Sequence, residues 1–201
     1  MFEYYYNAYS IAYFLVNQGL GKREQLDFLD MLFKDERERE FISPSYKQEQ
    51  LTDKENLRHL ILDVLYRVDY LNDPESFEKE YSAIENDYES LKNDELRLDT
   101  ERISINDFDE YDLYFMSVRL RIRFINDEKN QFVKIKLRKL LSQYGYKRRT
   151  EDLLNRMHDA MLFYHIQSYL RGGEICDIRD IDIDDMITFR IPGNDKRIVK
   201  Q

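Results

Sequence analysis

The sequence is short of the residues on which many catalytic and metal sites depend. It contains one cysteine, Cys176, and three histidines among 201 residues. A single cysteine excludes an intramolecular disulfide and a metal site of several thiolates, and it favours a reducing compartment. His158 and His165 lie seven positions apart on one predicted helix, about 10.5 Å along its axis, which is too far for the pair to share a metal ion. We therefore expect no enzymatic activity, no cofactor and no bound metal.

Long uncharged apolar runs are also missing. No segment approaches the roughly 20 apolar residues that a membrane-spanning helix requires. The N-terminal region carries no basic leader of the kind found in signal peptides, and polar residues interrupt it. We expect a cytoplasmic protein that does not associate with a membrane.

Negative charge dominates the chain but is unevenly distributed. The formal net charge is -9. Residues 1–116 carry 13 Lys and Arg against 28 Asp and Glu, residues 117–149 carry 11 against 2, and residues 150–201 carry 7 against 10. A strongly basic segment therefore lies between two acidic ones, and this asymmetry is the feature that bears most on function.

The N-terminal half has the pattern of a helical bundle. Apolar residues recur at helical spacing over 2–16 and over 22–38, where the second range has a charged, solvated end. The segment 52–68 opens on a capping box and continues as a third amphipathic helix. Residues 77–91 repeat at alternating spacings of four and three, which is typical of an a/d seam packed inside a domain. These elements predict an acidic helical bundle over 1–95.

The C-terminal half mixes strand and helix patterns. Residues 118–124 alternate strictly between apolar residues and arginines, which predicts a half-buried strand with a row of arginines on its other face. Residues 132–137 fit either a strand or the start of a helix. A short helix then ends at Gly145, and Thr150 caps a long helix that runs to Leu170.

Alternation returns near the end of the chain. Isoleucines and aspartates interleave over 178–183, and a second apolar alternation follows over 187–191, so we predict a two-stranded hairpin. Asp180, Asp182 and Asp184 would share one face of its first strand. Their spacing lacks the glycine and glutamate of a calcium-binding loop, and we interpret them as a solvated face.

The order of these elements is the outline of a winged helix. Residues 136–150, KLRKLLSQYGYKRRT, place a leucine pair, an aromatic-glycine turn and paired arginines ahead of a long helix. On these features residues 132–192 resemble winged-helix-like modules of bacterial nucleic-acid-associated proteins. The resemblance implies contact with nucleic acid, although the predicted wing, 177–185, is acidic.

The predicted fold is therefore α+β and predominantly helical. It consists of the acidic bundle over 1–95, a winged-helix-like module with short strands over 103–192, and a tail over 193–201. Apolar, tyrosine-rich faces on the first and fourth predicted helices leave a homodimer open.

The first functional hypothesis uses the basic segment. It describes a non-enzymatic accessory or regulatory protein of a bacterial or phage DNA-transaction or defence system, in which clustered Lys and Arg neutralise nucleic-acid phosphates. The candidate contact residues are Arg119, Arg121, Arg123, Lys134, Lys136, Arg138, Lys139, Lys147, Arg148 and Arg149.

The alternative uses the acidic surface. A phage-type inhibitor, such as an inhibitor of a bacterial immunity nuclease, would bind a protein partner through the acidic N-terminal half or present carboxylates in place of phosphates. A third reading is that the basic segment docks against the acidic half of its own chain and meets no nucleic acid.

Overall fold

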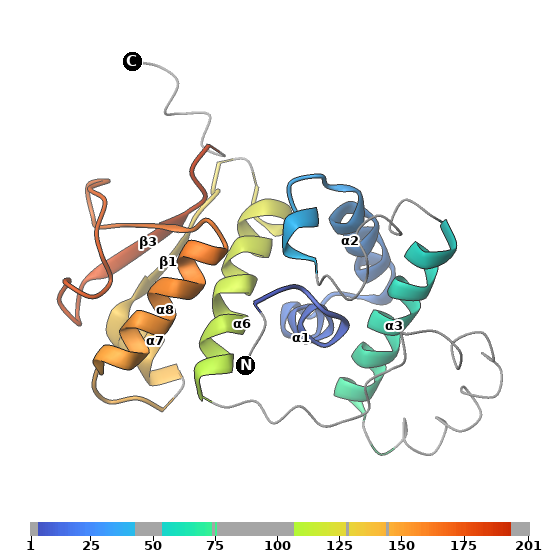
Figure 1. Cartoon of the computed structure of the whole chain (residues 1–201), viewed down its shortest axis with the longest axis horizontal. Coiled ribbons are helices and arrows are strands. Elements are labelled where there is room, and N and C mark those ends of the chain that lie inside the picture. The colour runs from blue at the N-terminus through green and yellow to red at the C-terminus, as the bar shows by residue number, and fades with distance from the viewer. Residues whose placement is uncertain are drawn as a thin grey trace. The chain divides into compact units, whose positions relative to one another are not determined.

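Helices and one small sheet make up the part of the chain that the computed structural model describes, which is residues 4–42, 54–73, 75, 107–127, 129–143 and 145–193. Within these ranges there are six α-helices and a three-stranded antiparallel sheet (Figure 1). The protein is thus of mixed α and β structure, as predicted. The predicted helix over 77–91 lies outside the described residues. No helix in these ranges is both long and apolar enough to cross a membrane.

The chain divides into two compact units, Tyr5–Ile103 and a second unit that joins Met1–Tyr4 to Ser104–Gln201. The first unit contains α1 (Ala8–Gln18), α2 (Lys22–Lys34), the 3-10 turn η1 (Arg39–Phe41) and α3 (Lys54–Asn72). Its core forms where α1 packs on α3.

A capping box explains where α1 begins, and a glycine explains where it ends. The Asn7 side chain accepts a hydrogen bond from the Ser10 amide at 2.8 Å, and the Ser10 hydroxyl accepts one from the Asn7 amide at 3.0 Å. This capping box satisfies amides that the first helical turn leaves unpaired. The helix ends at Gly19, whose φ of 63° is left-handed and suits glycine.

The charged run that was predicted as the solvated end of the second helix lies after α2 and is only in part exposed. The helix stops at Lys34, and Glu38 is fully buried. The Tyr6 hydroxyl donates a hydrogen bond to Glu38 Oε2 at 3.0 Å, which compensates part of the cost of burying that carboxylate. The sequence pattern does not reveal this hydrogen bond, because Tyr6 and Glu38 are 32 residues apart in the chain.

The second unit contains the sheet and the helices that cover it. In chain order its elements are α6 (Asp107–Leu120), the π-helical segment η4 (Arg121–Ile125), β1 (Val133–Lys136), α7 (Leu137–Gln143), α8 (Glu151–Phe163), β2 (Gln167–Tyr169) and β3 (Met186–Arg190). β3 is the central strand and pairs antiparallel with β1 on one side and β2 on the other. Thr150 is the N-cap of α8, as predicted, and its hydroxyl accepts the Leu153 amide.

The predicted strand over 118–124 is wrong, because this segment is the end of α6 followed by η4. Two helical rows of buried residues overlap there. Leu113, Met116 and Leu120 form one row with spacings of three and four, and Phe115, Val118 and Ile122 form another. α6 packs on α8, while Phe115 meets Phe189 of β3 edge-to-face at 5.4 Å. When a helix is buried around much of its circumference, two such rows of apolar residues alternate with polar residues along the sequence. The resulting pattern resembles that of a strand.

The long helix ends seven residues before the predicted Leu170. α8 stops at Phe163, and His165 takes a left-handed φ of 52°. The Ile166 amide then donates to the Met161 carbonyl at 2.8 Å, which closes the helix as glycine commonly does. The sequence has no glycine at this position, so the stop and the strand β2 after it were missed.

The predicted hairpin is also wrong in its first strand. Residues 178–185 form turns, in which the Asp184 amide donates to Asp182 Oδ1 at 2.9 Å and the Asp182 amide donates to Asp185 Oδ2 at 3.0 Å. Aspartate side chains compete in this way with sheet hydrogen bonds. The second predicted strand exists as β3, but its partners are β1 and β2.

Removing the α1 cap provides a test of the first unit. We expect Asn7→Ala to lower the free energy of unfolding by about 1 kcal/mol, because the Ser10 amide loses its acceptor. Urea denaturation followed by far-ultraviolet circular dichroism measures this. Asn17→Ala on the same helix is the matched control, since the exposed Asn17 side chain bonds only to a carbonyl one turn earlier. Equal losses in the two variants would contradict the capping role.

Candidate nucleic-acid interface

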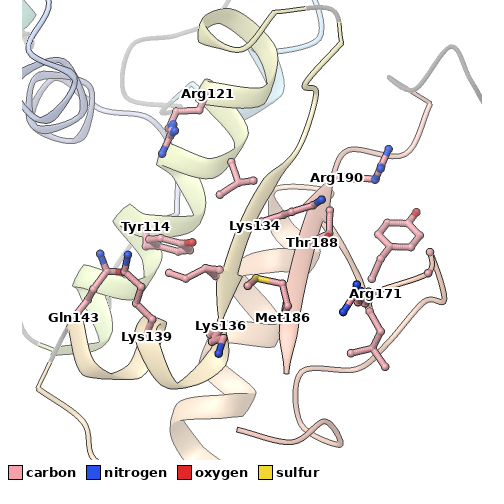
Figure 2. Close-up of a pocket in the computed structure, with 16 residues that line it drawn as sticks. Tyr114, Arg121, Lys134, Lys136, Lys139, Gln143, Arg171, Met186, Thr188 and Arg190 are labelled. Carbon is pink, nitrogen blue, oxygen red and sulfur yellow. The ribbon is translucent and has the colours of Figure 1, made fainter. Parts of the chain in front are cut away.

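A hollow of about 1050 Å³ lies over one face of the sheet in the second unit (Figure 2). Successive side chains of a strand point to opposite faces of the sheet. Ile187 and Phe189 of β3 are fully buried on the core side. Met186, Thr188 and Arg190 therefore point into the hollow. Lys134 of β1 lies opposite Thr188, and Thr188 lies opposite Tyr169 of β2. One row of side chains therefore crosses all three strands beneath the hollow.

We call this hollow the basic groove, defined by the sixteen residues that line it. Six of them are cationic, and none of the described lining residues is aspartate or glutamate. The cations come from η4, β1, α7, the loop after β2, and β3, and they are Arg121, Lys134, Lys136, Lys139, Arg171 and Arg190. In Figure 2 their labelled side chains stand around the hollow from both sides.

The charge composition of the basic groove has an electrostatic consequence. Like charges held around one concavity repel, and none of the described lining residues is a carboxylate. Low-dielectric walls and a concave shape focus the resulting positive potential. An anion entering the basic groove relieves this repulsion, so the arrangement favours ligands that carry several negative charges.

Aromatic rings hold two of the cations in place. Lys134 Nζ lies 4.7 Å from the centre of the Phe132 ring, and the Arg190 guanidinium carbon lies 5.4 Å from the same ring. Arg190 also lies 6.0 Å from the centre of the Tyr169 ring. Cation–π contacts of this kind restrain the long side chains without neutralising them.

Tyr114 forms part of the wall contributed by α6. Burial raises the pKa of its hydroxyl, and the nearby positive charge of Arg121 opposes that rise only in part. The phenol is therefore neutral at physiological pH. It adds a polar but uncharged group to the lining of the basic groove.

Arg119 corrects the predicted contact surface. Its side chain is 3% exposed, and its guanidinium donates to the Tyr164 carbonyl at 2.7 Å. This bond ties α6 to the end of α8, which explains why a charged residue is tolerated in the core. The prediction placed Arg119 on a surface because it assumed a strand. On the helix, it faces the interior.

Two other predicted contact residues bind the loop of residues 177–185, which we call the acidic loop. Arg138 forms a paired interaction with Asp184, with its Nε 2.6 Å from Oδ1 and its Nη2 2.8 Å from Oδ2. This hydrogen-bonded ion pair lowers the pKa of Asp184 and raises that of Arg138. Arg149 donates to the Ile181 carbonyl. Both arginines thus hold the loop against the rest of the unit.

The remaining predicted residues fall into two groups. Arg121, Lys134, Lys136 and Lys139 line the basic groove. Arg123, Lys147 and Arg148 are not among its lining residues. Arg123 is half-buried with its guanidinium carbon 5.8 Å from the Phe124 ring, whereas the other two are exposed in the turn before α8.

Sequence reasoning missed Arg171 and Arg190 because both lie outside the basic segment. A signal for Arg190 was present, since Met186, Thr188 and Arg190 alternate with the apolar residues of β3. Arg171 carried no such signal. It enters the basic groove because β2 ends at Tyr169 and a glycine turn follows.

Neither a metal site nor a reactive thiol appears in the described part of the chain. No group of three or more His, Cys, Asp or Glu side chains gathers there in a way that could hold a metal ion. Burial raises the pKa of the Cys176 thiol, although its hydrogen bond with Ser168 lowers it in part. A protonated thiol is a poor nucleophile.

The two neighbouring arginines Arg119 and Arg121 should differ in what they contribute. We expect Arg119→Met to lower the free energy of unfolding by about 1–3 kcal/mol, because the buried Tyr164 carbonyl loses its donor. Arg121→Met removes the same charge from an exposed position and should change stability little. Urea denaturation compares them. Similar losses for both variants would contradict the interior role of Arg119.

The acidic loop should respond to acid through Asp177. Hydrogen bonds from the Arg179 side chain lower the pKa of Asp177 to about 2. Since the ordinary value is about 3.9, this contribution to stability is complete above that value and is lost as the pH falls toward about 2. Asp177→Asn should therefore destabilise the protein near neutral pH, and the difference from the wild type should vanish near pH 2. Urea titrations over this range test it, with exposed Asp180→Asn as the matched control; a difference that does not depend on pH would contradict it.

Comparisons with known proteins find no relative from which the function of this chain could be inferred. No protein-family model matches it, and no match is found among curated proteins or among solved structures. Its function is therefore inferred from its own residues.

Proposed function

We propose that the second unit binds nucleic acid through the basic groove, and that the protein is a non-enzymatic accessory or regulatory component of a bacterial or phage DNA-transaction or defence system. One observation carries the proposal: six of the sixteen residues that line the groove are cationic and none of these described residues is acidic, in a chain whose formal net charge is -9. Cations gathered against the overall charge of the chain suit a polyanionic partner.

The surroundings of these cations support the same proposal. The chain neutralises other cations with its own carboxylates, as in the pairs of Arg138 with Asp184 and Arg179 with Asp177. The basic groove lacks such a carboxylate among its lining residues. Phosphates of a bound nucleic acid would bring negative charge to these cations and release counterions, which makes the affinity depend steeply on salt.

A winged-helix-like assignment of the second unit is part of the proposal. The order α6, β1, α7, α8, β2, β3 supports it, as does a sheet in which the last strand lies between the other two. In helix-turn-helix proteins the second helix of the motif enters the major groove. Here the exposed face of α8 carries Glu151, Asp152 and Asp159, and these would repel phosphates. We therefore assign the contact to the basic groove and not to α8.

A charge-reversal experiment tests this assignment. We expect Lys134→Glu combined with Lys139→Glu to weaken binding of labelled DNA at least tenfold and to reduce the slope of log affinity against log salt by about 2, because two phosphate contacts are lost. Fluorescence anisotropy at about 50 and 200 mM salt measures both quantities.

Two further double variants change the net charge equally. Lys22→Glu with Arg23→Glu alters exposed residues of α2 in the first unit and should leave binding nearly unchanged. Lys147→Glu with Arg148→Glu alters the exposed turn before α8 and should cost less than the groove variant. Equal losses in all three would indicate a nonspecific charge effect and contradict the assignment to the basic groove.

A second candidate function rests on the outer face of α2. Glu24, Asp27 and Asp30 are exposed there beside Leu26 and Met31, which are 42% and 48% exposed. Acidic and apolar groups together suit a protein partner with a basic surface, which is the chemistry expected of an acidic inhibitor. An absence of nucleic-acid binding even at about 50 mM salt would contradict the first proposal and favour this one.

A further inference from the structure

We infer that the basic groove takes single-stranded nucleic acid in preference to duplex. The inference rests on the proposed function, and it specifies the form of the ligand. It depends on what lies between the cations, because charge alone does not distinguish one strand from two.

Apolar and aromatic side chains interleave with the cations of the groove. Lys134 and Tyr169 belong to the same cross-strand row, separated by Thr188. Lys136 lies opposite Met186, a side chain that is 40% exposed. The groove thus places a thioether one strand spacing, about 5 Å, from Lys136 and an aromatic ring two strand spacings from Lys134.

This mixture suits a ligand that exposes phosphates and base faces together. In a duplex the bases are stacked on one another, and only their edges reach the grooves. An unpaired strand presents both its backbone and its base faces. Proteins that bind single strands combine a positive groove with aromatic platforms on which bases stack.

The size of the groove is compatible with the same ligand. Pockets for single small molecules occupy about 300–1,000 Å³, so a hollow of about 1050 Å³ has room for a short stretch of one strand. Part of its lining lies deep: Thr188 is 7% exposed, and Tyr114 is half-buried. Flexible unpaired bases can reach such a floor, whereas the regular surface of a duplex would touch mainly the rim cations.

Tyr169 is the residue that we expect to stack against a base. It is half-buried at the groove, and Arg190 lies 6.0 Å from the centre of its ring, so a guanidinium plane and an aromatic ring adjoin one another. Both groups stack on bases without regard to sequence. The preference should therefore concern strandedness and not sequence.

The test compares a labelled mixed-sequence DNA strand of about 12 nucleotides with the duplex of the same sequence, by fluorescence anisotropy at about 50 mM salt on the full chain. We expect the single strand to bind at least tenfold more tightly. Tyr169→Leu removes the ring but keeps apolar bulk, and it should weaken single-strand binding roughly fivefold or more while leaving duplex binding unchanged. Tyr169→Phe keeps the ring and should bind as the wild type does.

The outcomes separate this inference from the proposed function. Equal or tighter binding of the duplex, lost in Lys134→Glu with Lys139→Glu but unaffected by Tyr169→Leu, would overturn the single-strand preference and leave the groove as a nucleic-acid site. Absence of binding to either probe would overturn both. A loss in Tyr169→Phe equal to that in Tyr169→Leu would also count against stacking, since the ring is retained.

Discussion

The pairing of β3 with a neighbour on each side is the constraint on which the second unit depends. Ile187 and Phe189 of this strand are completely buried, and a strand has a period of two, so Met186, Thr188 and Arg190 are committed to the opposite face. The register with β1 then puts Lys134 and Lys136 on that same face. A slip of β1 by one residue would turn Lys134 and Lys136 toward the core and Ile135 toward solvent, which the burial of Ile135 disfavours.

The cations of the second unit fall into two groups. Some are used internally: Arg119 bonds a buried carbonyl, and Arg138 and Arg149 hold the acidic loop. Others surround the basic groove, where none of the described lining residues is acidic. An internal cation contributes to folding through the partner that its bond fixes, whereas the groove cations are placed where an external anion could also reach them.

The π-helical segment links the interior to the groove. The Asn126 amide donates to the Arg121 carbonyl at 2.8 Å, five residues back, so the helix widens where η4 follows α6. Such widenings recur at functional sites. Here the widened turn begins at Arg121, the one residue of this segment that lines the groove, while Ile122 beside it is fully buried. Adjacent residues of η4 thus have different roles: Ile122 packs in the core, and Arg121 lines the groove.

The sequence by itself determined the features that depend on neighbouring residues: the caps at Thr150 and Gly19, the helices α2 and α7, the short alternation of β3, and the excess of positive charge over 117–149. Only the tertiary structure decided the rest. The segment 118–124 is helical, because burial on several sides imitates the alternation of a strand, and α8 ends at Phe163, where His165 and not a glycine takes the left-handed conformation. The tertiary structure also brought Arg171 and Arg190 to the lysines of β1, since strand pairing joins residues that are far apart in the chain.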